Sequence, residues 1–174
     1  MKTLIVRALL GAITIGSSSV AGAAERFSDW RTGDLIFHES TSAQATAIRV
    51  ATGSRYTHMG IVRQTDAGLY VVEAAQTVSQ TPLRDFLARG VGRDYSVYRV
   101  AALTPEAADS AIVASLTYAG RPYDIFFRLD PDRIYCSELP FYAFQKIGIE
   151  LGKIERLGDL SIDTSEGRAI FLSR

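Results

Sequence analysis

Cysteine and histidine are scarce in this sequence of 174 residues, which has one cysteine, Cys136, and two histidines, His38 and His58. A single cysteine cannot form a disulfide within the chain, so Cys136 is an intermolecular cross-link, an inert core residue or a nucleophile. One cysteine, two distant histidines and no HExxH pattern argue against a zinc site. No glycine-rich phosphate-binding loop is recognisable, so we expect neither a metal nor any other cofactor.

Charge of one sign is not in excess either, because 19 Lys and Arg residues balance 19 Asp and Glu residues. Non-specific nucleic-acid binding rests on basic side chains that neutralise phosphates, so this balance argues against nucleic acid as a partner. The apolar run 8–15 is too short to span a bilayer, which takes roughly 20 apolar residues. The hydrophobic content of 47% is nevertheless enough for a packed core.

The first 23 residues have the layout of a secretory signal peptide. Lys2 and Arg7 are positive, the apolar run 8–15 follows, and the small residues 21–23 suit a cleavage site. We therefore predict a periplasmic or secreted protein, with a retained N-terminal anchor as the alternative. Cleavage removes Lys2 and Arg7 and no acidic residue, which leaves 17 basic and 19 acidic side chains in a single domain, 24–174.

Strand and helix signals are mixed along that domain, which predicts the α+β class. β-Branched and aromatic residues predict strands at 35–37, 57–64, 69–76 and 94–101, the second and third of them joined as a hairpin. Helices are expected at 41–54, 82–89, 104–120 and 136–148. Thr81 and Thr104 are the expected N-caps, because each precedes a proline at the first helical position. Residues 121–133 read as a loop with aromatic anchors, and the tail after Gly152 as irregular.

The chemistry is expected around Cys136, at the start of the last of these helices. Unpaired N–H groups and the helix dipole favour an anion there, so a thiolate is stabilised. A thiolate nucleophile also needs a base. His38, followed by Glu39 and Ser40, is expected in a solvated turn, whereas His58 begins a strand and shares a face with Gly60. That glycine leaves space beside the ring for another segment or a ligand, so His58 is the expected base.

The residue that orients His58 depends on the register of the hairpin. A four-residue loop, 65–68, pairs Gln64 with Leu69 and places Glu73 on the same face as His58. A buried carboxylate needs a partner, and the imidazole is the obvious one. A three-residue loop would instead bring Gln76 opposite His58, and an amide can also orient an imidazole. Glu73 is the preferred candidate, with a purely structural role for it as a further alternative.

With His58 before Cys136, the order of the residues is reversed relative to papain. In that order the segments GDLIF, ATGSRYTHMGIV, YVVEAAQTV, TPLRDFLARG, GRPYDIFF and YCSEL together resemble the YiiX/YebB-like permuted papain-like cysteine peptidases of the NlpC superfamily. The resemblance implies a small antiparallel sheet or partial barrel packed against helices, circularly permuted. It also implies that Cys136 is the nucleophile, His58 the base and Glu73 its orienting residue, with Tyr123 and Tyr135 near the substrate.

Three functions follow from this interpretation. The leading one is an exported thiol hydrolase that cleaves an amide through an acyl-enzyme on Cys136, acting on a small peptide, an amino-acid amide or a cell-wall fragment. The second is lipid acyl hydrolysis or transfer by the same triad, which needs an apolar platform; its candidate side chains are Phe126, Phe127, Phe141, Tyr142 and Phe144. The third is a non-catalytic binding module that keeps the fold.

Overall fold

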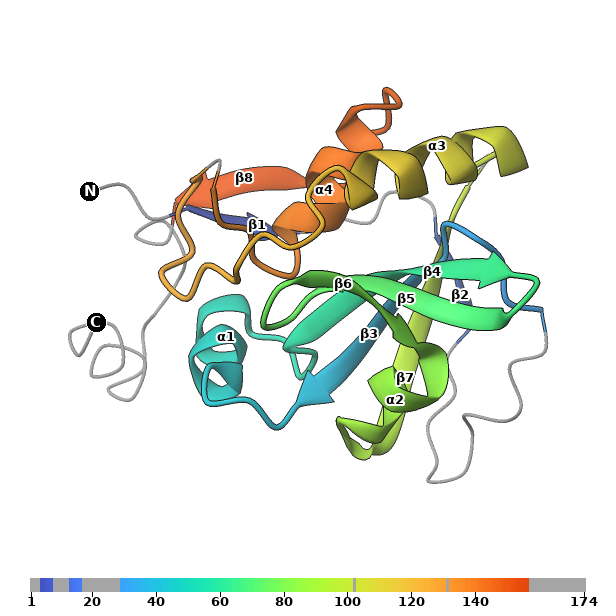
Figure 1. The fold of residues 1–174 in the computed structure, drawn as a ribbon. Coiled ribbons are helices and arrows are strands. Elements are labelled where there is room, and N and C mark those ends of the chain that lie inside the picture. Colours follow the sequence, from blue (N-terminus) through green and yellow to red (C-terminus); the bar gives the residue numbers. More distant parts are fainter. Residues whose placement is uncertain (1–3, 8–12, 17–28, 102, 131, 157–174) are drawn as a thin grey trace.

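An antiparallel sheet lies at the centre of the molecule (Figure 1), in a computed structural model that describes residues 4–7, 13–16, 29–101, 103–130 and 132–156. Its strand order is β2-β7-β3-β4-β5-β6, and each neighbouring pair is antiparallel. The strands are β2 (Ile13–Gly16), β3 (Leu35–Ser40), β4 (His58–Thr65), β5 (Gly68–Ala74), β6 (Val78–Pro82) and β7 (Gly90–Val100). With the helices described below, this confirms the α+β class.

Two strands come from the segment that the sequence predicts to be a signal peptide. β1 (Leu4–Arg7) pairs with β8 (Lys153–Arg156), and β2 pairs with the edge of the main sheet along β7. The expected irregular tail is therefore wrong for residues 153–156, which form β8; residues 157–174 lie outside the described part of the chain. Cleavage after residue 23 stays a prediction, since that position is also outside it.

The hairpin β4–β5 has the register that the preferred loop predicted. Gln64 pairs with Leu69, and the ladder continues to the pair Thr65 and Gly68. The turn itself is thus only two residues, Asp66 and Ala67, rather than four, but the pairing of every other position is unchanged. The alternative three-residue loop is excluded. Because side chains alternate along a strand, this register fixes which residues share the face of His58.

Within the described residues, four helices complete the fold: α1 (Ala45–Thr52), α2 (Leu83–Ala88), α3 (Pro105–Leu116) and α4 (Glu138–Gln145). Thr104 caps α3 as predicted, because its side chain accepts a hydrogen bond from the Ala107 N–H at 3.2 Å. Thr81 is not a cap: it lies in β6, paired with Val71, and α2 begins at Leu83 without a side-chain cap. The sequence of β6 lacks the apolar alternation that would predict a strand. β6 lies at the edge of the sheet, where a strand has a neighbour on one side only.

The helices cover the two faces of the sheet. Figure 1 shows α3 and α4 on one side of it and α2 on the other. The core under α3 and α4 contains Met59 and Ile61, whereas the core under α2 contains Val62, Val71 and Phe86. This is the alternation expected of β4. His58 lies at the first position of β4, where side chains from both layers can reach it.

Candidate active site

Pairing of β4 with β5 brings His58 beside Glu73. His58 Nε2 lies 2.6 Å from Glu73 Oε2, the His58 side chain is 10% exposed, and the Glu73 side chain is fully buried. The space beside the ring is filled by β5: a Cβ on Gly60 would lie 2.3 Å from Val71 Cγ1 and 2.9 Å from the Val72 carbonyl oxygen. Gly60 thus allows β4 and β5 to approach closely, and this places the Glu73 carboxylate beside the His58 imidazole.

The second carboxylate oxygen of Glu73 pairs with Arg89, which sequence reasoning missed. Arg89 Nη2 donates to Glu73 Oε1, and the arginine follows the last residue of α2. Burial raises the pKa of Glu73, but the hydrogen bond and charge of His58, the Thr81 hydroxyl and the charge of Arg89 together hold it below its ordinary value. No local pattern marks Arg89, because its partner lies 16 residues away on β5 and only the tertiary structure joins them.

Cys136 lies in the turn that leads into α4, two residues before the first helical residue. The turn is closed by two hydrogen bonds: the Glu138 N–H donates to the Tyr135 carbonyl at 3.1 Å, and the Tyr135 N–H donates to Glu138 Oε2 at 3.2 Å. Cys136 is 5% exposed, and the Tyr123 hydroxyl donates to its Sγ at 3.7 Å. Burial raises the pKa of the thiol, but hydrogen bonds from His58, Tyr123 and the Ser137 backbone, with the His58 charge, lower it overall.

His58 therefore lies between an anionic carboxylate and the thiol. Burial lowers the pKa of His58, but hydrogen bonds and charges from Cys136 and Glu73 outweigh burial and raise it to about 9. Nε2 is occupied by Glu73, which leaves Nδ1 for the sulfur. Raising the imidazole pKa while lowering the thiol pKa is the condition for a thiolate–imidazolium pair.

His38 does not lie in a solvated turn, contrary to the sequence prediction. β3 continues through it to Ser40, so His38 is 1% exposed, pairs with His58 across β3 and β4, and stacks on Phe86 at 4.4 Å. Burial and the charges of His58 and Arg89 lower its pKa to about 3, so the ring is neutral. A Cβ on Gly90 would come within 3.0 Å of His38 Nδ1, so β7 packs directly against this ring.

The two tyrosines expected near the substrate lie in different environments. Tyr123 lines the cleft beside His58 and contacts the sulfur. Tyr135 is 1% exposed and its ring packs against Phe127 at 5.4 Å, in a small core with Phe141. Its place in the core explains its position next to Cys136. Of the two tyrosines, Tyr123 lines the cleft, and a substrate-binding role stays a prediction for both.

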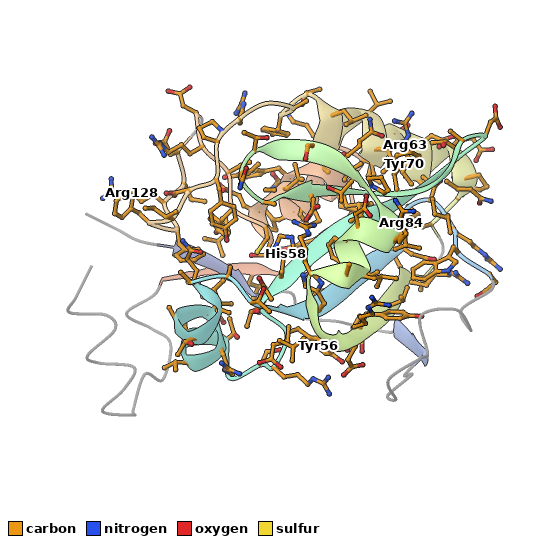
Figure 2. The ribbon with its side chains drawn as sticks, turned by 60° about the horizontal axis from the view of Figure 1, so that its bottom comes forward. Tyr56, His58, Arg63, Tyr70, Arg84 and Arg128 are labelled. Atoms are coloured by element: carbon orange, nitrogen blue, oxygen red, sulfur yellow. The ribbon has the colours of Figure 1, made fainter. Side chains whose placement is uncertain are left out.

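A cleft of about 510 Å³ lies against His58 and Tyr123. The volume suits a small-molecule ligand. Its polar lining includes the hydroxyl and amide side chains of Ser40, Thr57 and the exposed Gln76, the two histidine rings and the guanidinium of Arg89. No Asp or Glu of the described residues lines it. Figure 2 shows His58 near the centre of the molecule and Arg128 at the outer end of the loop 121–133.

The five aromatic side chains considered as an acyl-chain platform do not form an exposed surface. Phe127, Phe141 and Phe144 are buried, and Tyr142 is only partly exposed. Phe126 is 42% exposed, with the Arg128 guanidinium 4.6 Å from its ring centre. Within the described residues, no helix is long and apolar enough to cross a membrane. The cavity that borders His58 is thus the cleft described above and not an exposed aromatic platform.

Comparison with known proteins identifies the family of this chain. Residues 29–173 match the family described as permuted papain-like amidase enzyme, YaeF/YiiX, C92 family. The chain belongs to this family. It is 34% identical over 141 residues to the uncharacterized protein YiiX of Escherichia coli strain K12, a match that covers 80% of this chain and 70% of that protein. The expected permuted papain-like fold is confirmed.

A solved structure supports the same fold. The crystal structure of metalloprotein YiiX from Escherichia coli O157:H7 aligns with a TM-score of 0.78 at 34% identity, over 82% of this chain and 81% of that one. In the part of the present chain that the structure describes, no group of three or more His, Cys, Asp or Glu side chains is placed to hold a metal ion. Glu73 already bridges His58 and Arg89. The donors at this site therefore do not fit a metal.

Proposed function

We propose that this permuted papain-like amidase is a thiol hydrolase in which Cys136 is the nucleophile, His58 the general acid and base, and Glu73 the residue that orients His58. The observation that carries the proposal is His58 held between the Glu73 carboxylate, at 2.6 Å, and the thiol. The lowered pKa of the thiol and the raised pKa of the imidazole support it, as does the cleft beside His58 and Tyr123.

The proposed reaction proceeds by acyl transfer to the thiol. The Cys136 thiolate attacks the amide carbonyl carbon and forms a C–S bond, and the developing oxyanion collapses with cleavage of the C–N bond. His58, protonated at the outset, gives its proton to the leaving amine as general acid. It then takes a proton from water, whose oxygen attacks the thioester, and the carboxylic acid and the thiolate–imidazolium pair are released. Glu73 keeps the imidazolium oriented throughout.

The substrate class that we propose is a small peptide, an amino-acid amide or a cell-wall fragment. A cleft of about 510 Å³ lined by hydroxyl and amide groups has room for such a ligand and offers hydrogen bonds to its polar atoms. We also propose that residues 1–23 direct export, which would bring the protein to these substrates. Mass spectrometry of the protein recovered from a periplasmic extract tests this part, and a chain that keeps residues 1–23 there contradicts it.

The experiment on the thiol compares wild type with Cys136→Ala and Cys136→Ser on a panel of amino-acid amides, dipeptides and purified stem peptides. Product is followed by liquid chromatography and mass spectrometry, and the intact protein mass is measured during turnover. We expect an adduct of acyl mass on wild type alone and a loss of hydrolysis of at least 10³-fold in both variants. Equal turnover by wild type and Cys136→Ala would exclude the thiol mechanism and favour the binding module.

A further inference from the structure

Arg89 is an ion-pair partner inside the candidate active site that has no role in the chemistry described above. Its guanidinium donates to Glu73 Oε1, while Glu73 Oε2 contacts His58. The Glu73 side chain is fully buried, and the Arg89 side chain is 43% exposed and lines the cleft. Arg89, Glu73, His58 and Cys136 thus form one continuous chain of polar contacts from the cleft wall to the sulfur.

Arg89 is itself fixed in place. It is the C-cap residue of α2, where its N–H bonds to the carbonyl groups of Phe86 and Leu87. The guanidinium carbon lies 5.7 Å from the centre of the Phe86 ring, which also stacks on His38. The next residue, Gly90, begins β7 against His38. The C-terminus of α2 and the start of β7 therefore hold the Arg89 guanidinium beside the Glu73 carboxylate.

We infer that Arg89 is a positioning residue of the catalytic site, which holds Glu73 as an oriented carboxylate and through it keeps His58 paired with Cys136. The inference rests on the proposed function. A carboxylate with no exposed surface is costly unless its charge and its oxygens have partners. Besides His58, Glu73 has the neutral Thr81 hydroxyl and the Arg89 guanidinium, so Arg89 is the permanent cation beside it. Without Arg89, the carboxylate can rotate away from His58 or take up a proton, and either change weakens the imidazolium that stabilises the thiolate.

Loss of the Arg89 charge should shift the pKa values of Glu73 and Cys136 in one direction, upward. The ionisable groups that surround His58 are Glu73, Arg89, His38 and Cys136, with the Tyr123 hydroxyl on the sulfur. Of these, His38 is neutral near pH 7. Removing the arginine takes away the cation that stabilises the Glu73 carboxylate, so the pKa of Glu73 rises. The pKa of the Cys136 thiol rises too, because the imidazolium that stabilises the thiolate is weakened.

The test compares Arg89→Met, Arg89→Lys and Arg84→Met with wild type. Methionine keeps the stem that packs over Phe86 but removes the charge, and lysine keeps the charge. Arg84 is the matched control, because it lies on the same helix α2, is 88% exposed and pairs only with its neighbour Asp85 among the ion pairs of the described residues. Circular dichroism and thermal melting establish that each variant is folded before it is used.

The readout is the rate of Cys136 alkylation by iodoacetamide from pH 5 to pH 9, which needs no substrate. We expect the acid limb of Arg89→Met to move to higher pH by roughly 0.5–1 unit, with Arg89→Lys between it and wild type and Arg84→Met superimposed on wild type. With an amide substrate, kcat of Arg89→Met should fall roughly ten- to a hundredfold while KM changes little. The lost charge-assisted hydrogen bond joins Arg89 to Glu73 and does not contact the substrate.

Two results separate this inference from the proposed function. Wild-type Cys136 that alkylates no faster than free cysteine overturns the activated thiol, and the role of Arg89 with it. An activated wild type whose profile superimposes on that of Arg89→Met overturns the role of Arg89 alone. An equal shift in Arg89→Lys and Arg89→Met also contradicts it, because lysine retains the cation.

Discussion

Replacing Glu73 by glutamine changes the chemistry of the site without changing its shape. In the wild type both carboxylate oxygens accept hydrogen bonds, one from His58 and one from Arg89. Glutamine has one acceptor end and one donor end. Arg89 has only donors, so the amide oxygen must remain with it and the NH₂ group must face His58 Nε2.

That orientation selects the wrong tautomer of the imidazole. A donor opposite Nε2 requires Nε2 to be the unprotonated nitrogen, so the ring proton moves to Nδ1, which faces the sulfur. A neutral ring with Nδ1–H cannot accept the proton of the Cys136 thiol. In the imidazolium form, Nε2–H and the NH₂ group of the glutamine would be two donors facing each other. The equivalent change in a serine-protease triad lowers turnover by about 10⁴ through the same effect.

We therefore expect Glu73→Gln to lower kcat by about 10²–10⁴, which corresponds to about 2.7–5.4 kcal/mol in the activation free energy. Alkylation of Cys136 by iodoacetamide at pH 6 should slow in parallel. Gln76→Ala is the control, because Gln76 is exposed on the cleft wall, and it should cost less than about tenfold. A kcat of Glu73→Gln within tenfold of wild type, or a greater loss in Gln76→Ala, would refute the assignment of the orienting residue.

Three further predictions follow from the same structure. The profile of kcat/KM against pH should fall on the alkaline side near pH 9, where His58 loses its proton, and a limb near pH 7 would contradict the raised pKa. Burial raises the pKa of Glu138 to about 7, so its contribution to stability is complete below about pH 4.5 and lost as the pH rises through 7. Urea unfolding should therefore show Glu138→Gln more stable than wild type by up to about 3 kcal/mol at pH 8 but equal to it near pH 4, and a pH-independent difference would contradict this. Gly60→Ala should lower the free energy of unfolding by about 1–3 kcal/mol, because its Cβ meets the backbone of β5, and an unchanged melting temperature would show that the strands can separate freely.

Much of the fold is encoded locally and was accessible from the sequence. The hairpin register follows from the apolar alternation of two adjacent runs and a turn signal, and the preferred four-residue loop predicts Glu73 on the face of His58. The cap at Thr104 is equally local, since the threonine, the proline and the bonded N–H lie within four residues. Such features depend on contacts between neighbours in the chain, which is why spacing predicts them.

The position of His38 could not be predicted from its neighbours in the sequence. Its polar neighbours Glu39 and Ser40 indicate a turn, yet β3 continues through them because it pairs with β4 on one side and β7 on the other. β6 is similar, since nothing in the sequence of Val78–Pro82 marks a strand until β5 lies beside it. The burial of Tyr135 against Phe127 also depends on how the loop 121–133 folds back on α4.

The amino-acid sequence supplies the reactive groups: one thiol, two imidazoles, and a carboxylate on the strand next to one of them. Which of these groups meet, and how they are charged, depends on how the chain packs. Arg89 reaches Glu73 across 16 residues, and Tyr123 reaches Cys136 from a separate loop. Burial at these contacts shifts the pKa values of His58, Glu73 and Cys136. Burial depends on how the whole domain packs, so the spacing of residues along the chain does not predict it.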